Sequence, residues 1–300
     1  MKKTLALLLS LLFIVAMLAA CGDTDAPDAG TPTPDNTGSE VTPDAENPET
    51  DTPEFIAPDV IRIGMECEYA PYNWTQFEET EFSVPIGGGA YADGYDVQIA
   101  KIVAERLGSR LEIVKTEWDG LPPSLTSGMI DLIIAGMTDT PERRETIDFT
   151  EVYWISDVVI VVTADGQYAD ADSIDDFAGA KITGQLSTIH YDLIDKIEGV
   201  DKQEAMADFP TMLMSLSSGK IDGYIAERPT AIAAGLSNPS VKYIAFDADK
   251  GFGEEVPVSV GIRKGEDAFK TAVNEILAEI TETQRQQIME DAIARQPLSE

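Results

Sequence analysis

The sequence predicts an α/β fold for the part of the chain that follows residue 60. Short apolar runs typical of strands alternate there with segments whose apolar residues recur at helical spacing. The chain has 300 residues, of which 43% are apolar, enough for one large or two ordinary domains with real cores. These two observations indicate a globular α/β body.

The expected elements follow one another in the order strand, helix, strand. The first strand is expected at residues 60–65, where large apolar side chains alternate. A helix is expected over 97–107, and Gly108 stands where helices commonly end in a left-handed residue. Further strands are expected at 111–114, 132–135, 158–162, 182–183, 221–226, 241–246 and 258–262, and further helices around 189–197, 269–280 and 288–292.

The charge balance excludes several classes of function. The chain holds 21 Lys and Arg against 54 Asp and Glu, a net charge of −33, so it would repel the phosphates of a nucleic acid. One histidine, His190, and two cysteines, Cys21 and Cys67, are too few for a zinc cluster or an all-cysteine iron–sulfur site. We therefore expect no cofactor, no metal and no nucleic-acid partner. His190 is expected to be structural, and Cys67 to be a small buried side chain.

The N-terminus is typical of an exported lipoprotein. Lys2 and Lys3 precede an apolar run over residues 5–20, which is too short for a spanning helix. The run ends in Leu-Ala-Ala-Cys-Gly and resembles a bacterial lipobox, so we expect cleavage after residue 20 and a lipid on Cys21. The alternative is an uncleaved short anchor. Residues 21–59 are acidic and rich in proline, which predicts a disordered tether outside the cell membrane.

A candidate anion site lies where the predicted strand at 132–135 ends. Gly136 follows that strand, and Thr140 and Pro141 look like the N-cap and first residue of a helix. Open α/β sheets bind ligands at this end of their strands. Because Arg143 offers a planar fork that suits a carboxylate, the pattern predicts a carboxylate clamp. The alternative is an ordinary surface arginine.

Five separated motifs resemble those of the family 3 solute-binding proteins of amino-acid ABC transporters. In chain order they are Gly64-Met65-Glu66-Cys67-Glu68-Tyr69-Ala70-Pro71-Tyr72, Gly94-Tyr95-Asp96-Val97, Glu117-Trp118-Asp119-Gly120-Leu121, Gly128-Met129-Ile130-Asp131 with the clamp, and Ile147-Asp148-Phe149-Thr150. The resemblance implies a periplasmic-binding-protein fold of type II, two α/β lobes joined by two crossover strands. It places lobe 1 at about 60–155 plus 257–300 and lobe 2 at about 156–256.

The resemblance also implies which residues bind the amino acid. Arg143 would hold the α-carboxylate and Glu227, on the other lobe, the α-ammonium, so only the closed state satisfies both charges. Tyr69 and Trp118 would form aromatic walls beside the ligand side chain. The other expected contacts are Glu66, Gly136, Met137, Thr138, Gln185, Ser187, Thr188 and Ile189.

Two segments depart from the family pattern. Ser187 and Thr188 stand where the family commonly has Gly-Thr or Gly-Ser, which puts the closest backbone approach there in question. Residues 74–93 form a longer segment than in compact members, and their run of three glycines, 87–89, predicts a flexible surface hairpin rather than a phosphate cradle.

Acidic residues near the expected pocket indicate the class of ligand. Glu66, Glu68 and Asp119 favour a basic or amide amino acid over an acidic one, and we expect a monomer that delivers it to a membrane permease. One alternative is a periplasmic dehydratase acting on prephenate-like acids, which would need a second cation beside Arg143 and Arg144. The other is an extracellular sensor domain, which would need a spanning helix that the sequence does not offer after residue 20.

Overall fold

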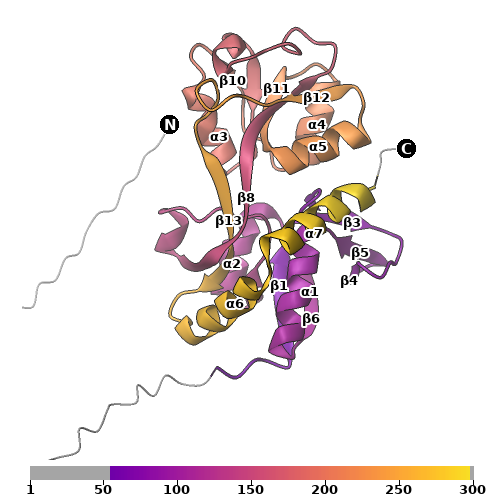
Figure 1. The fold of residues 1–300 in the computed structure, drawn as a ribbon, viewed down its shortest axis with the longest axis vertical. Helices are drawn as coiled ribbons and strands as arrows, with labels where there is room; N and C mark the ends of the chain where they lie inside the picture. The colour runs from indigo at the N-terminus through magenta and orange to yellow at the C-terminus, as the bar shows by residue number, and fades with distance from the viewer. Residues whose placement is uncertain (1–54, 298–300) are drawn as a thin grey trace, which may run out of the picture. The chain divides into compact units, whose positions relative to one another are not determined.

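The structure is a computed structural model that describes residues 55–297, drawn as a ribbon in Figure 1. The described residues belong to one compact unit. The expected signal segment, the lipidated Cys21 and nearly all of the expected tether lie outside them. Among residues 55–297, no helix combines the length and the apolar character that crossing a membrane requires.

One half of the molecule, here called lobe 1, is built on a mixed sheet. The first strand pairs in parallel with two others, so Ile63 lies between Ile113 on one side and Leu132 on the other. All three side chains are buried, as expected for strands covered on both faces. The strands are β6 (Arg110–Lys115), β1 (Val60–Met65), β7 (Leu132–Ile133) and β13 (Glu255–Arg263), and the helices are α1 (Tyr95–Leu107), α2 (Leu121–Thr126), α6 (Asp267–Glu279) and α7 (Glu282–Arg295).

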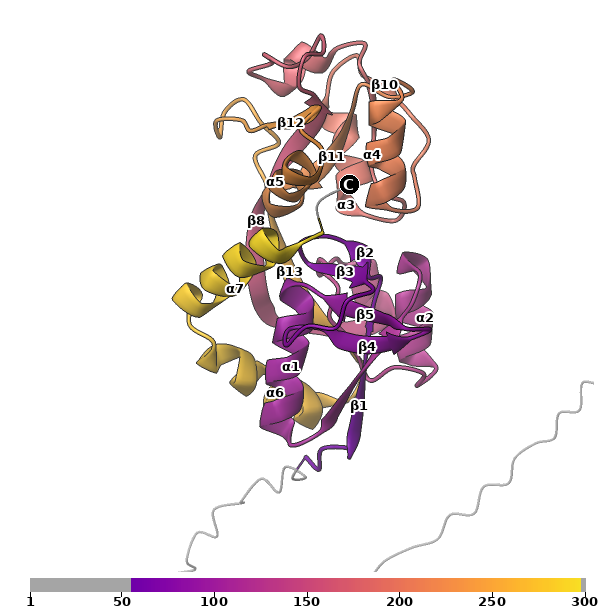
Figure 2. The same ribbon diagram turned by 90° about the vertical axis from the view of Figure 1, so that its right-hand side faces the viewer.

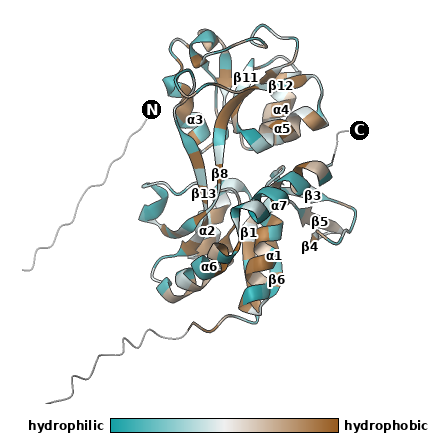
Figure 3. Cartoon of the chain, in the orientation of Figure 1, coloured by the Kyte–Doolittle hydropathy of each residue, from teal (hydrophilic) through white to brown (hydrophobic). Residues whose placement is uncertain are grey.

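The other half, lobe 2, has strands that continue the same nine-stranded sheet and has helices of its own. Its elements are β9 (Lys181–Thr183), α3 (Ile189–Leu193), β10 (Asp201–Lys202), α4 (Phe209–Ser217), β11 (Gly223–Glu227), α5 (Arg228–Ser237) and β12 (Val241–Ile244). Helix α3 is shorter than the periodicity predicts, because the chain tightens into a 3-10 turn at Ile194–Lys196. Buried hydrophobic residues gather along the strands of both lobes, while the peripheral loops are mostly hydrophilic (Figure 3).

Two strands connect the lobes and are hydrogen-bonded to each other. Strand β8 (Ile147–Thr163) is 17 residues long; it pairs with β13 in lobe 1 and lies between β11 and β12 in lobe 2. The antiparallel ladder between β8 and β13 extends from Arg263 opposite Ile147 to Glu255 opposite Asp157, with register shifts on either side of Ser259. Figure 1 shows the two strands side by side between the lobes, which is the arrangement of two crossover strands that the sequence predicts.

A second, four-stranded antiparallel sheet holds the longer segment at 74–93. Its spatial order is β2 (Glu68–Tyr69), β3 (Asn73–Gln76), β5 (Ala90–Asp93) and β4 (Val84–Gly87), visible beside α1 in Figure 2. The predicted hairpin is confirmed by the pairing of β4 with β5. Its turn uses φ values of 88°, 63° and 78° at residues 87–89, which glycine adopts without steric cost.

The prediction of a helix that begins at Thr140 and Pro141 is wrong. Residues Arg143–Glu145 form a single 3-10 turn, because Ile147 already starts β8 and leaves no room for an α-helix. Thr140 nevertheless caps this turn, since its Oγ1 accepts the Arg143 N–H at 3.2 Å and its carbonyl accepts that of Arg144 at 2.9 Å.

Candidate functional site

A small cavity lies between the two lobes and takes its walls from both. It has room for water of about 10 Å³, close to the minimum for one molecule. The lobes are therefore closed on each other, and a ligand of amino-acid size requires them to separate. The lining residues are Tyr69, Trp118, Gly136, Thr138 and Arg143 from lobe 1, and Gln185, Thr188, Ile189 and His190 from lobe 2. We call this the interlobe cavity.

Three contacts close the lobes around the cavity. The Gln185 amide donates to both carboxylate oxygens of Glu66, at 2.9 and 3.2 Å. The Tyr69 ring stacks on Phe209 with centroids 4.5 Å apart, and the Arg143 guanidinium donates to the carbonyl of Ser187 at 2.9 Å. Each contact joins a residue before β8 to a residue after it, so all three break when the lobes part.

Arg143 is the cation of the site. Its Nη1 donates to the Thr138 carbonyl at 2.6 Å, and its guanidinium carbon lies 5.2 Å from the centroid of the Trp118 ring. Burial lowers the pKa of Arg143 to about 10, so the side chain stays charged at neutral pH. Because its donors point at carbonyl oxygens in both lobes, it can offer a charged fork to an anion that enters between them.

The loop that carries Gly136 is held by a buried polar network. The Gly136 N–H donates to the Tyr153 hydroxyl at 2.9 Å, and that hydroxyl donates to Asp96 at 2.7 Å. The other Asp96 oxygen accepts from the Asn73 amide at 2.8 Å. The amide of Gly136 is thus engaged inside lobe 1. Sequence reasoning missed this network, because its members lie in three elements and one loop and share no local motif.

Gly136 also needs the freedom of a glycine. Its φ is 61°, and a Cβ placed there would lie 2.9 Å from the Tyr69 ring. The next two residues differ in exposure to the cavity: Met137 is buried in the core and does not line it, whereas Thr138 does. Thr138 bridges to Val258 of β13, so the loop that carries Gly136 and Thr138 is attached directly to a crossover strand.

Ser187 adopts the left-handed conformation, with φ of 57°. A residue with a Cβ pays roughly 1–2 kcal/mol for this backbone, which explains why a glycine is the usual choice there. The loop accepts the strain because it is fixed on both sides: the Leu186 N–H donates to Met206 at 2.8 Å, and the Thr188 hydroxyl donates to Gln185 at 2.7 Å.

We expect Ser187→Gly to stabilise the protein. Relief of the left-handed strain is partly offset by the greater freedom of glycine in the unfolded chain, which leaves a gain of up to about 1 kcal/mol. Thermal unfolding should therefore show a melting temperature higher by roughly 2–4 °C. Ser187→Ala keeps a Cβ and serves as the control. An equal rise in Ser187→Ala would show that backbone strain is not the cause.

Glu66 is a buried acid beside the interlobe cavity. It does not line the cavity but holds the lining residue Gln185. Burial raises the pKa of Glu66 to about 7, against the opposing hydrogen bond from Gln185, and the charges of Glu68, Asp208 and Glu117 raise it further. This end of the site therefore attracts a positive charge or hydrogen-bond donors.

The raised pKa of Glu66 predicts a pH-dependent stability. Its pKa rises from 4.5 in the unfolded chain to about 7 in the folded one, so its stabilising contribution is present below 4.5 and is lost as the pH rises to 7. The loss amounts to about 3 kcal/mol at most. Glu66→Gln keeps an acceptor for Gln185 but cannot ionise. The difference between the melting temperatures at pH 5 and pH 8 should therefore be smaller in this variant than in wild type. An equal difference in both proteins would show that Glu66 does not cause the pH dependence.

Glu227 and His190 form a buried pair in lobe 2. Glu227 ends β11 and is 1% exposed; its Oε1 lies 3.2 Å from His190 Nε2. Burial raises the pKa of Glu227 to about 8 and lowers that of His190 to about 4, so the pair carries no net charge near pH 7. His190 lines the cavity and Glu227 does not. We expected His190 to be structural, and the sequence did not indicate that its side chain forms part of the cavity wall.

Cys67 matches its prediction as a small buried side chain. It is 1% exposed and forms no disulfide within residues 55–297, and its N–H donates to the Asn73 side chain at 2.6 Å. Burial raises the pKa of the Cys67 thiol to about 12, so it is a neutral thiol and a poor nucleophile at neutral pH.

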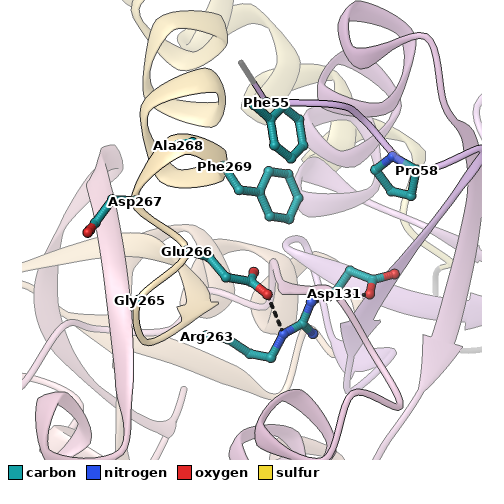
Figure 4. A pocket seen from close by; sticks show the side chains of 9 residues that line it. All are labelled: Phe55, Pro58, Asp131, Arg263, Gly265, Glu266, Asp267, Ala268 and Phe269. Carbon is teal, nitrogen blue, oxygen red and sulfur yellow. Dashed lines mark hydrogen bonds and ion pairs between the residues drawn. The ribbon is translucent and has the colours of Figure 1, made fainter. Parts of the chain in front are cut away.

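A larger hollow of about 630 Å³ lies within lobe 1 (Figure 4). Phe55 stacks on Phe269 there, with centroids 4.7 Å apart, and Arg263 pairs with Glu266 at 2.7 Å. No residue of the expected ligand set lines this hollow. Among the described residues no cluster of His, Cys, Asp and Glu could hold a metal ion.

Comparison with known proteins identifies the family. The sequence model of the bacterial extracellular solute-binding proteins, family 3, matches residues 61–293. A probable histidine-binding protein of Campylobacter jejuni is 28% identical over 193 residues, which is 64% of this chain and 70% of that protein.

Solved structures agree with the predicted type II fold. An amino acid ABC transporter substrate-binding protein, AbpA from Streptococcus pneumoniae bound to L-arginine, superposes with a TM-score of 0.67 at 22% identity, over 79% of this chain and 95% of that one. An ancestral arginine-binding protein bound to glutamine gives 0.65 at 26% identity, over 78% and 97%. The match agrees with the prediction of a solute-binding protein rather than an enzyme: the chain belongs to family 3 of the bacterial extracellular solute-binding proteins.

Proposed function

We propose that the protein binds a polar amino acid, basic or amide, between its lobes and delivers it to the permease of an ABC transporter. The observation that carries this proposal is the interlobe cavity, in which Arg143 donates to carbonyl oxygens of both lobes. A carboxylate that replaces those oxygens would gain the charged fork and hold the lobes together. The relatives reported above bind histidine, arginine or glutamine by name, which supports the ligand class.

Charge at the far end of the site supports a basic or amide side chain. Glu66 is surrounded by the charges of Glu68, Asp208 and Glu117, all of which disfavour another anion. Both Glu66 oxygens now accept from the Gln185 amide. A guanidinium, ammonium or amide group of a ligand could supply the same kind of donor to this acid.

The dehydratase alternative gains no support from the cavity. Of the residues that line it, only Arg143 carries a fixed positive charge. Arg144, the second candidate cation, pairs instead with Asp139 at the surface and is not among the lining residues. A dicarboxylate substrate would therefore meet one arginine where it needs two cations.

The expected attachment and organisation complete the proposal. The protein would work as a monomer outside the cell membrane, held by a lipid on Cys21 through the tether at 21–59. Its lobes would be 60–155 plus 257–300, and 156–256. The lipobox-like sequence supports the anchor, and the β8–β13 ladder supports the boundary near 155–157. Cys21→Ser should move the protein from the membrane fraction to the medium.

A binding screen tests the function. The purified protein, freed of bound small molecules by partial unfolding and refolding, is heated with each of the twenty amino acids, ornithine, cystine and prephenate. A ligand at 100 times its Kd stabilises the folded state by about 2.7 kcal/mol, which is a shift of several degrees. Shifts with basic or amide amino acids are expected. No shift with any amino acid, or turnover of prephenate, would overturn the proposal.

A further inference from the structure

A cluster of buried polar atoms in lobe 2 has no hydrogen-bond partner among the described residues. It comprises both ring nitrogens of His190, Oε2 of Glu227 and Oγ1 of Thr230. These residues come from α3, the end of β11 and the first turn of α5. Leaving such atoms unpaired is unfavourable, so a group that supplies the missing hydrogen bonds would gain affinity.

His190 is the member of this cluster that reaches the interlobe cavity. It is one of the cavity's lining residues, while Glu227 and Thr230 are not. Its Nε2 lies 3.2 Å from Glu227 Oε1, and its ring meets the edge of Phe209 with centroids 6.4 Å apart. A ligand in the cavity therefore meets the imidazole in front and the carboxyl group behind it.

The chemistry of the pair suits a positive group. Three side chains face the imidazole: the Arg143 guanidinium from lobe 1, whose charge lowers its pKa, the Glu227 carboxyl group from β11, and the uncharged Phe209 ring from α4. Burial and Arg143 keep the imidazole neutral, with its pKa lowered to about 4. A neutral imidazole has one N–H and one lone pair. Since neither ring nitrogen has a hydrogen-bond partner among the described residues, the lone pair is available to accept from an ammonium.

We propose that His190 is a specificity-determining residue of this chain, facing the α-ammonium of the ligand, with the Glu227 carboxyl group behind it. The inference rests on the proposed binding of an amino acid. If Glu227 alone recognised the α-ammonium, changing His190 would not affect the choice of ligand. In our proposal the imidazole also decides whether a ligand with an α-amino group is preferred to one without it.

The test compares ligands with and without the α-amino group. Isothermal titration measures Kd for L-arginine beside guanidinovaleric acid, and for L-glutamine beside glutaramic acid, in the full purified protein. His190→Phe keeps an aromatic ring against Phe209 but removes both ring nitrogens. We expect it to weaken amino-acid binding roughly 10- to 100-fold, the cost of one charge-assisted hydrogen bond, and to change binding of the acids without the amino group less than about three-fold.

Two further variants separate a role in recognition from a role in folding. His190→Gln retains a donor for Glu227 and an acceptor for the ligand, so it should recover most of the preference for the α-amino group. Glu198→Gln, a loss of one exposed acid in the same lobe, should leave both affinities unchanged. Melting temperatures of all variants confirm that each is folded at the temperature of titration.

The outcomes distinguish this inference from the function on which it rests. If wild type binds an amino acid and His190→Phe keeps the same preference for the α-amino group, the assignment of His190 is overturned and the function stands. Equal losses for both kinds of ligand would also overturn it, because they indicate a general effect on closure. If wild type binds no amino acid at all, both proposals fail.

Discussion

Arg143→Ala is expected to abolish amino-acid binding while leaving the folded protein nearly as stable as wild type. The side chain holds the only fixed positive charge among the residues that line the cavity. Without it a carboxylate would enter a closed site with no charged partner. Removing one partner of a desolvated, hydrogen-bonded ion pair costs about 2–5 kcal/mol, which lowers affinity roughly 30- to 5,000-fold.

Stability should respond little, because Arg143 packs at the edge of the cavity and not in a core. Its guanidinium donates to the carbonyls of Thr138 and Ser187, and water can reach these oxygens once the lobes part. Arg143 is half-buried, and a hydrogen bond that water can replace contributes about 0.5–1.5 kcal/mol net, so the loss of stability should stay within about 1.5 kcal/mol. Titration calorimetry and thermal unfolding, both on the ligand-free protein, measure the two effects separately.

Arg144→Ala is the matched control. It removes the same side chain one residue away, where it is exposed and paired with Asp139. Affinity in this variant should remain at the wild-type value. If Arg143→Ala binds as wild type does, or if Arg144→Ala loses binding to the same extent, the carboxylate clamp is assigned to the wrong residue.

Asp96→Ala is expected to give the largest loss of stability. Asp96 is fully buried and accepts from Tyr153 and Asn73; burial raises its pKa to about 6 in spite of these bonds. The substitution leaves two buried donors unpaired and opens a cavity. We expect a loss of roughly 3–5 kcal/mol in the free energy of unfolding, a fall of about 6–20 °C in melting temperature.

Glu105→Ala is the control for this variant. Glu105 lies on the same helix, α1, but is exposed, so its loss should change the melting temperature by less than about 2 °C. A small effect of Asp96→Ala would mean that the Tyr153 hydroxyl finds another acceptor. Ligand affinity should also fall in Asp96→Ala, because the same hydroxyl holds the amide of Gly136.

Much of the fold can be predicted from the sequence because its signals are local. The run that becomes β7 is buried on both faces and shows as a continuous hydrophobic stretch, whereas β1 shows the alternation of apolar side chains expected for a strand. The helix expected after Thr140 fails for a non-local reason. The capping residue is present, but the long crossover strand begins seven residues later at Ile147 and limits the chain to one turn.

Some residues of the candidate site could likewise be predicted from local motifs, and others could not. Arg143, Tyr69 and Trp118 lie in motifs along the chain, and the structure brings them to one cavity. Phe209, which stacks on Tyr69 from the other lobe, belongs to no such motif, because its role depends on how the lobes meet. The position of His190, two residues after the expected contact Thr188, is the one feature of the sequence that could have indicated its place at the cavity. Only the orientation of its ring shows that it stands between the cavity and Glu227.

The ladder between β8 and β13 restricts how the lobes can move. A single strand between two bodies permits rotation about its bonds, whereas two hydrogen-bonded strands resist twisting and slippage of register and yield mainly by bending across the ribbon. Lobe 2 therefore searches few orientations relative to lobe 1. When it swings back, Gln185 returns to Glu66 and Ser187 to Arg143 in the same register each time. A hinge that bends about one axis is then enough to bring the cavity residues of lobe 1 and lobe 2 together around a ligand.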